Sequence, residues 1–277
     1  DNDNDNDILR TTILKKDCSN DCIPSKYSYC SALVNSRDGK GRTPLHWSAR
    51  NGQDDVCRLL LNTYHADIHA SSDTNSHSQT KRDRGVTPLE LCVWQNHFST
   101  AEILIEIGRS VNGRPNIVDR VNGYGCGIYH WCALSPSFAA RQTVDGDVAA
   151  AAKDVWSLMA LLQSSSIHSP ETDTSRRINT PNHHGQTLLH KAAYAGNMPM
   201  LAYLLRPPGM PHTATIHVDS HASISSHANT GVQANDPMVM DDALDEDGNT
   251  AADCAERSGR RDVASWVRRF ACPMLIS

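Results

Sequence analysis

The chain has 277 residues, 39% of them apolar and 21% charged, and a formal net charge of −5. A negative chain has no overall attraction for nucleic acid or an anionic membrane, and no apolar run approaches the ~20 residues of a membrane-spanning helix. The length is ample for a buried core, but the apolar share is low for a globular domain. We therefore expect part of the chain to lie outside any core.

The chain begins with an acidic low-complexity run, Asp1 to Asp7, and has no initiating Met. This start predicts a cut or fragment end. Nine cysteines, an odd number, are scattered along the chain. Such a pattern does not predict a disulfide framework, and it favours a reducing compartment, the cytoplasm or the nucleus.

One sequence motif occurs five times from residue 38 onwards. It consists of an Asp or Asn, a following Gly, a Thr that opens a short helical pattern, and a Leu- or Val-rich run further on. Four of the five copies start with Asp or Asn, and in one copy Gly replaces the Thr. In chain order the Thr position holds Thr43, Thr87, Gly127, Thr187 and Thr250.

Each part of the motif has a local physical role. Asp or Asn opens a β-turn by bonding its own backbone, and Gly adopts a conformation that other residues avoid. Thr is a favoured N-cap, and Pro44 or Pro88 at the first helical position has no N–H to leave unsatisfied. Gly52, Gly196 and Gly259 are expected to end the first helix in a left-handed turn. The apolar second helix then returns antiparallel, and because one pair cannot bury its own face, the units must stack.

This motif, with links between units such as Ala66-Asp67-Ile68-His69, resembles the ankyrin-repeat family. The resemblance implies an all-α solenoid of stacked helix-turn-helix units with β-turn fingers over residues 31–277. The steps between Thr positions exceed the ~33 residues of the family repeat, which predicts long inserted loops, the insert at about 207–243 being disordered. Residues 1–30 are predicted to hold the acidic start and a degraded upstream repeat. The five units are expected at about 38–70, 82–112, 122–163, 182–206 and 245–270.

Three histidines, His46, His130 and His190, recur at one position of the motif. Because stacked helices lie about 10 Å apart, the three side chains cannot share one metal ion or one catalytic site. In the family, the His at this position holds neighbouring backbone through its ring nitrogens. The resemblance implies the same structural role here.

Nothing in the sequence predicts an enzyme or a metal centre. Neither of two candidate zinc clusters has the second ligand pair that structural zinc sites show. There is also no Gly-rich phosphate loop, Ser–His–Asp arrangement or paired-carboxylate setting. We therefore expect no catalytic residue, metal, cofactor or small-molecule substrate. The two clusters are Cys18, Cys22 and Cys30, and Cys126, His130 and Cys132.

The tryptophans and the C-terminal arginines were considered as binding groups. Trp47 and Trp131 share one position of the first helix and are expected to be packing residues, whereas Trp94 falls where the family's first helix faces the concave groove. The arginines between Arg257 and Arg269 predict a solvated polar cap on the last unit, because repeat arrays need a polar outer end. They do not predict a nucleic-acid surface.

The resemblance implies a partner-binding surface, since ankyrin repeats bind partners with the finger tips and the exposed face of the first helices. The predicted tips are basic early in the chain and acidic late, so we expect a partner of the opposite polarity along its length. Carried over position by position, the surface comprises Lys40, Arg42, Arg50, Asn51, Arg84, Trp94, Gln95, Tyr124, His183, His184, Gln186, Tyr194, Glu246, Asp247 and Arg257.

These inferences favour a protein–protein interaction scaffold or adaptor that binds another protein. An alternative is a regulatory ankyrin segment of a larger enzyme or channel, for example an acyltransferase, kinase or ubiquitin-ligase component, because the missing Met indicates truncation. The full reading frame would separate the two hypotheses.

Overall fold

The computed structural model describes residues 32–72, 85–109, 116–136, 148–165, 180–205 and 243–271. These residues form five pairs of helices, which we call units one to five, and the second helix of unit one continues as a π-helical turn, η1. The pairs are α3 (Pro44–Arg50) with α4 (Asp54–Arg58) and η1 (Leu59–Thr63), α5 (Pro88–Trp94) with α6 (Phe98–Arg109), α7 (Ile128–Ala133) with α9 (Val148–Ser164), α11 (Leu188–Ala195) with α12 (Met198–Leu205), and α13 (Ala251–Arg257) with α14 (Arg261–Ala271).

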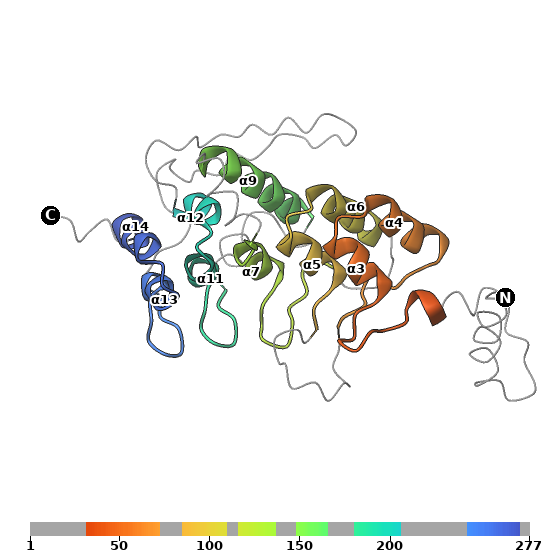
Figure 1. The fold of residues 1–277 in the computed structure, drawn as a ribbon, viewed down its shortest axis with the longest axis horizontal. Coiled ribbons are helices and arrows are strands. Elements are labelled where there is room, and N and C mark those ends of the chain that lie inside the picture. The colour runs from red at the N-terminus through yellow and green to blue at the C-terminus, as the bar shows by residue number, and fades with distance from the viewer. Residues whose placement is uncertain are drawn as a thin grey trace, which may run out of the picture.

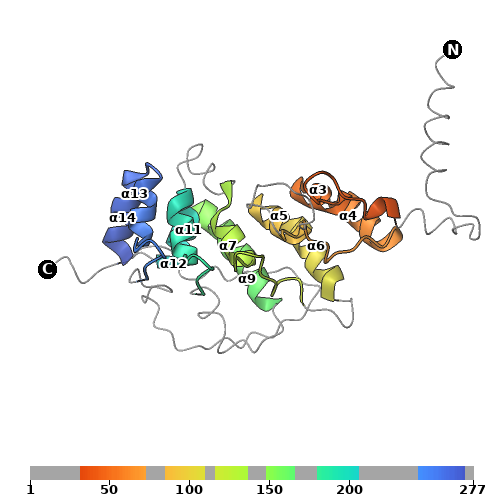
Figure 2. The same cartoon turned by 90° about the horizontal axis from the view of Figure 1, so that it is seen from below.

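The five units are stacked in chain order along the long axis of the molecule (Figures 1 and 2). The first helices form one layer, in which α3 packs on α5, α5 on α7, α7 on α11 and α11 on α13. The second helices form the other layer, and the loops that precede the first helices project from the opposite side (Figure 1). The predicted all-α solenoid is therefore confirmed.

The ends of the first helices follow from the residues at the two ends of the motif. The N-cap positions have extended backbone, and Pro44 occupies the first helical position of α3 as expected. Gly52, Gly196 and Gly259 have φ values of 66°, 69° and 82°, so the predicted left-handed turns are present. Gly196 has a second reason to be glycine, because a Cβ there would lie 2.5 Å from Nε of Arg260 in the next unit.

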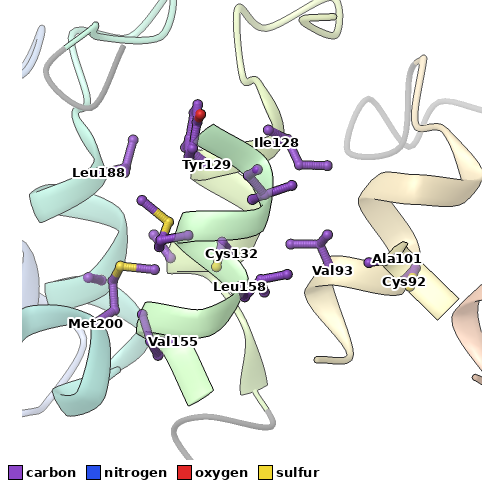
Figure 3. Close-up of a cluster of buried hydrophobic side chains, with 14 of the residues drawn as sticks. Cys92, Val93, Ala101, Ile128, Tyr129, Cys132, Val155, Leu158, Leu188 and Met200 are labelled. Atoms are coloured by element: carbon purple, nitrogen blue, oxygen red, sulfur yellow. The ribbon is translucent and has the colours of Figure 1, made fainter. Parts of the chain in front are cut away.

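One hydrophobic core runs through all five units. Its regular members include Leu45, Leu89 and Leu189, which are exposed by no more than 2% and occupy the same position of the first helix. Figure 3 shows the middle of this core, where side chains of α7 and α9 lie between those of unit two and unit four. Unit three, whose motif lacks both Thr and Pro, is thus held in the stack by packing on both sides.

Several predictions concern residues outside the described part of the chain. They are the upstream repeat at 1–30, nearly all of the insert at about 207–243, Arg84 on the second finger, and the cluster of Cys18, Cys22 and Cys30. Among the described helices, none combines the length and the hydropathy needed to cross a membrane.

Candidate partner-binding surface

The fingers of units one, three, four and five are tight turns, each held by one acidic or amide side chain. Oδ1 of the first turn residue accepts hydrogen bonds from the backbone N–H groups two and four residues further on, at 2.8 to 3.0 Å. The Gly three residues after it has a φ between 71° and 75° in these four fingers, a conformation that favours glycine. The motif therefore fixes the shape of the finger while leaving the tip residues free to vary. The four turn residues are Asp38, Asn122, Asn182 and Asp245.

The tips of units three, four and five form one continuous edge. The backbone N–H of His183 donates to the carbonyl of Tyr124 at 2.8 Å, and that of Glu246 donates to the carbonyl of His184 at 3.0 Å. The His184 ring lies 6.2 Å from the Tyr124 ring and places Nδ1 3.0 Å from Oε2 of Glu246. Four predicted contact residues from three units are thereby brought together.

The recurring histidines join units one, three and four to the units that follow them. Nδ1 of His46 accepts a hydrogen bond from the backbone N–H of Thr43 at 3.0 Å, and Nε2 donates to the carbonyl of Val86 at 3.0 Å. Nε2 of His130 and Nε2 of His190 make the equivalent bonds, at 3.3 and 3.1 Å, to the carbonyls of Gln186 and Asn249.

These bonds agree with the structural role that the resemblance implies. Burial lowers the pKa of His46 and of His130 to about 4, so both rings are neutral near pH 7 and can serve as acceptor and donor at once.

In unit two the place of the histidine is taken by Glu90, which is 2% exposed. Its Oε2 accepts a hydrogen bond from the backbone N–H of Thr87 at 2.8 Å, and this bond lies within unit two. Burial raises the pKa of Glu90 to about 7. In its ionised form the carboxylate has no proton to donate, and among the described residues the bonds of Glu90 are to Thr87 and not to the carbonyl of the next unit.

The first helices of units one and two carry an aromatic and cationic cluster that we call the Trp–Arg–Trp cluster, formed by Trp47, Arg50 and Trp94. The guanidinium carbon of Arg50 lies 5.3 Å from the centre of the Trp47 ring and 5.9 Å from that of the Trp94 ring. Trp47 donates its indole N–H to Oδ2 of Asp38 at 3.0 Å, and Trp94 donates its own to the carbonyl of Leu134 at 3.2 Å. The cluster joins three consecutive units.

Two predictions for unit one need correction. Trp47, expected to be a packing residue, is 36% exposed, because its ring lies between the finger and α3 and not in the core. Arg42, expected at an exposed tip, is only 8% exposed. Its backbone closes the turn on Asp38, and its guanidinium carbon lies 5.3 Å from the centre of the Trp47 ring. A sequence signal for Trp47 existed, because it lies three positions before Arg50, and Arg50 occupies the same position of the first helix as Trp94.

The remaining predicted contact residues differ in exposure. Tyr194 is 57% exposed on α11, whereas Gln95, Tyr124 and Gln186 are half-buried. The Arg257 guanidinium donates to Oδ1 of Asn249 at 2.9 Å and is therefore tied to its own finger. The other described members are exposed; they are Lys40, Asn51, His183, His184, Glu246 and Asp247.

In the fold, the three side chains of the second candidate zinc cluster have different partners and do not form a common site. Sγ of Cys126 lies 3.3 Å from the amide nitrogen of Asn182, while the Cys132 side chain is completely buried in the core. Both ring nitrogens of His130 are bonded to backbone. Within the described ranges, no group of three or more His, Cys, Asp or Glu side chains could hold a metal ion.

The fold and this surface define a helical repeat protein with finger-like turns. The family model for ankyrin repeats in three copies matches residues 3–115, and the model for a single ankyrin repeat matches residues 184–211. The chain belongs to the ankyrin-repeat family. Ankyrin repeats are generally protein–protein interaction modules, and the family is typically non-catalytic.

Proposed function

We propose that this chain is an interaction scaffold or adaptor that binds a partner protein through its finger tips and the concave face of its first helices. The observation that carries this proposal is the Trp–Arg–Trp cluster, which presents two indoles and a guanidinium on that face. Trp, Tyr and Arg are the residues that contribute most to protein–protein binding energy. A partner seated there would also reach the exposed ring of Tyr194 in unit four.

The stacking supports a preformed binding surface. Hydrogen bonds between units fix the tips of units three to five relative to one another, and the histidine bonds fix the fingers of units two, four and five to the preceding first helix. A surface that is ordered before binding loses little conformational entropy when the partner arrives. The exposed tips carry Lys40 in unit one and Glu246 with Asp247 in unit five. This change of charge along the array supports a partner that is acidic where it meets unit one and basic where it meets unit five.

We place this interaction in a reducing compartment, the cytoplasm or the nucleus. The described cysteines are free thiols and all are buried, where they serve as small apolar side chains. A disulfide framework is what an oxidising compartment would favour.

A capture experiment with a double variant tests the proposal. The chain is used as bait in an extract of its native cells, and Trp94→Ala combined with Arg50→Glu removes one indole and reverses the central charge. We expect a stoichiometric partner to be retained by the unaltered chain and reduced at least about tenfold by the variant, as quantified by mass spectrometry.

The matched control makes the same two types of change on the second helices. Phe98→Ala with Arg58→Glu also removes an exposed aromatic ring and reverses an arginine, but in α6 and α4. Capture should be unchanged in this control. Equal capture by the unaltered chain and by the Trp94/Arg50 variant would show that the concave face is not the binding surface.

A further inference from the structure

Among the described residues, the guanidinium of Arg50 has no acceptor. Within the described part of the chain, its contacts are the two indole rings of the cluster, and no hydrogen bond or ion pair is made by its N–H groups. Arg50 is only half-exposed, so these donors are partly shielded from water. A guanidinium carries five N–H donors, and those of Arg50 still reach solvent, where the acceptor of a ligand can replace water.

The position of this guanidinium is fixed in advance. Each flanking indole is anchored through its N–H, Trp47 on Asp38 and Trp94 on Leu134. The end of α3 is fixed as well, because the carbonyl of Arg50 bonds with Nε2 of His97 at 3.1 Å. An arginine held in this way loses little rotamer freedom when an acceptor binds.

The chemistry of the acceptor follows from geometry and charge. The planar guanidinium matches a carboxylate, which accepts two parallel N–H donors. A phosphate monoester carries a charge of about −1.5 to −2 and is usually met by several arginines. Arg42, the other arginine against Trp47 in the described part of the chain, is buried, so one accessible guanidinium balances one carboxylate.

The surface also determines what surrounds that carboxylate. Asp38, which contacts the cluster through Trp47, accepts the N–H groups of Lys40, Arg42 and Trp47 and makes no bond with Arg50 among the described residues. The exposed part of the Trp47 ring offers an apolar contact beside the guanidinium. A matching ligand therefore combines a carboxylate with an adjacent apolar side chain.

We propose that Arg50, flanked by Trp47 and Trp94, is the recognition point for an acidic linear segment of the partner protein, in which a Glu or Asp carboxylate pairs with the guanidinium and a neighbouring apolar side chain lies on the indole surface. This inference rests on the proposed function and names the partner chemistry at the same face. Lys40, exposed on the first finger, adds a second positive charge towards further acidic residues of the segment.

A peptide-display selection tests this assignment. Random 16-residue peptides are selected on the purified full chain, on Arg50→Gln, on Arg50→Glu and on the control Arg58→Gln in α4. We expect the unaltered chain and the control to enrich peptides with Glu or Asp beside an apolar residue. Arg50→Glu should lose that enrichment and favour Lys or Arg at the same position.

The strongest selected peptide is then synthesised with its central Glu, with Gln and with phosphoserine, and binding is measured by fluorescence anisotropy. We expect Arg50→Gln to weaken binding of the Glu peptide by about 10- to 100-fold, the range for a lost charge-assisted pair. The Gln peptide should bind the unaltered chain correspondingly weakly and should be indifferent to Arg50→Gln. Unchanged far-UV circular dichroism of the variant shows that the fold is retained.

Three results would overturn the assignment. They are selected peptides without acidic enrichment, equal binding of the Glu peptide by the unaltered chain and Arg50→Gln, and tight binding of the phosphoserine form alone. If no peptide is selected but the capture experiment still loses a partner on the Trp94/Arg50 variant, the acidic linear segment is refuted while the scaffold function stands. If the peptide selection and the capture experiment both fail, the proposed function is refuted together with the acidic linear segment.

Discussion

At the scale of single residues, the polar groups of this chain are mostly occupied in holding backbone. His46 is fully buried and connects Thr43 of its own unit with Val86 of the next. Each side-chain atom that bonds backbone in this way removes an orphan donor or acceptor at a helix start. A histidine that looks like a catalytic or metal-binding group in the sequence is therefore a structural link.

Replacing His46 with Ala should lower the free energy of unfolding by about 2–3 kcal/mol, because two buried bonds are lost and a cavity remains. Urea denaturation followed by circular dichroism measures this change. His184→Ala is the control, since this ring is exposed on a finger, and it should change stability by less than about 0.5 kcal/mol. An equal effect of the two substitutions would contradict the structural role.

The low pKa of His46 also makes stability depend on pH. Its pKa is about 4 in the folded chain and about 6.5 when unfolded, so below pH 6.5 the unfolded chain takes up a proton that the folded chain does not. The contribution of His46 is present above pH 6.5 and is lost as the pH falls towards 4.

Between pH 7 and pH 5, the unaltered chain should therefore lose about 1–2 kcal/mol more than the His46→Ala variant. Urea titrations of both chains at pH 7, 6 and 5 give the difference directly. Other titrating groups, such as Glu90, are present in both chains and cancel. If the free energies of unfolding of the two chains change in parallel with pH, His46 is not buried in its neutral form.

At the scale of helices and units, the joint between units two and three differs from the others. The carbonyls of Val86, Gln186 and Asn249 each bond with a histidine of the preceding unit. At the joint between units two and three the equivalent carbonyl is that of Cys126, and the facing side chain is Glu90, whose described bonds remain within unit two. This joint thus lacks one bond that the other joints have.

Glu90→His should supply that bond and raise the free energy of unfolding by about 1 kcal/mol at pH 7. Thermal or urea unfolding would measure the gain. Asp253→His in unit five is the matched control, because no further unit follows within the described residues to offer a carbonyl. If Glu90→His is no more stable than the unaltered chain, the histidine bond does not limit this joint.

The helix pairs were predictable because their signals are local. Thr-Pro at a helix start and Gly at a helix end act within a few residues, and the glycine turns were found where the motif placed them. Even unit three, without Thr or Pro, kept His130 and the apolar pattern of its first helix.

The Trp–Arg–Trp cluster was predictable only in part, because its members come from different units. Trp94 and Arg50 were expected on the concave face, but Trp47 was assigned to packing. Its exposure depends on how the finger lies against α3, which the helical periodicity of α3 does not reveal. The burial of Arg42 has the same cause. Contacts that cross a unit boundary cannot be inferred from the periodicity of one unit.

At the scale of the whole molecule, stacking joins helix pairs that cannot bury their apolar faces alone, and the stacked pairs present one continuous surface. Each unit contacts mainly its neighbours, so the first helices and the fingers are displayed side by side along the array (Figure 1). Such a face suits an extended partner segment that crosses several units. The second helices share the core with the first helices and form the opposite face.

Hydrogen–deuterium exchange of the chain, free and bound to its captured partner, shows which face the partner covers. We expect binding to slow exchange in peptides that cover α3, α5 and the fingers of units three to five, and to leave α4, α6 and α12 unchanged. Slower exchange confined to those second helices would contradict binding through the concave face.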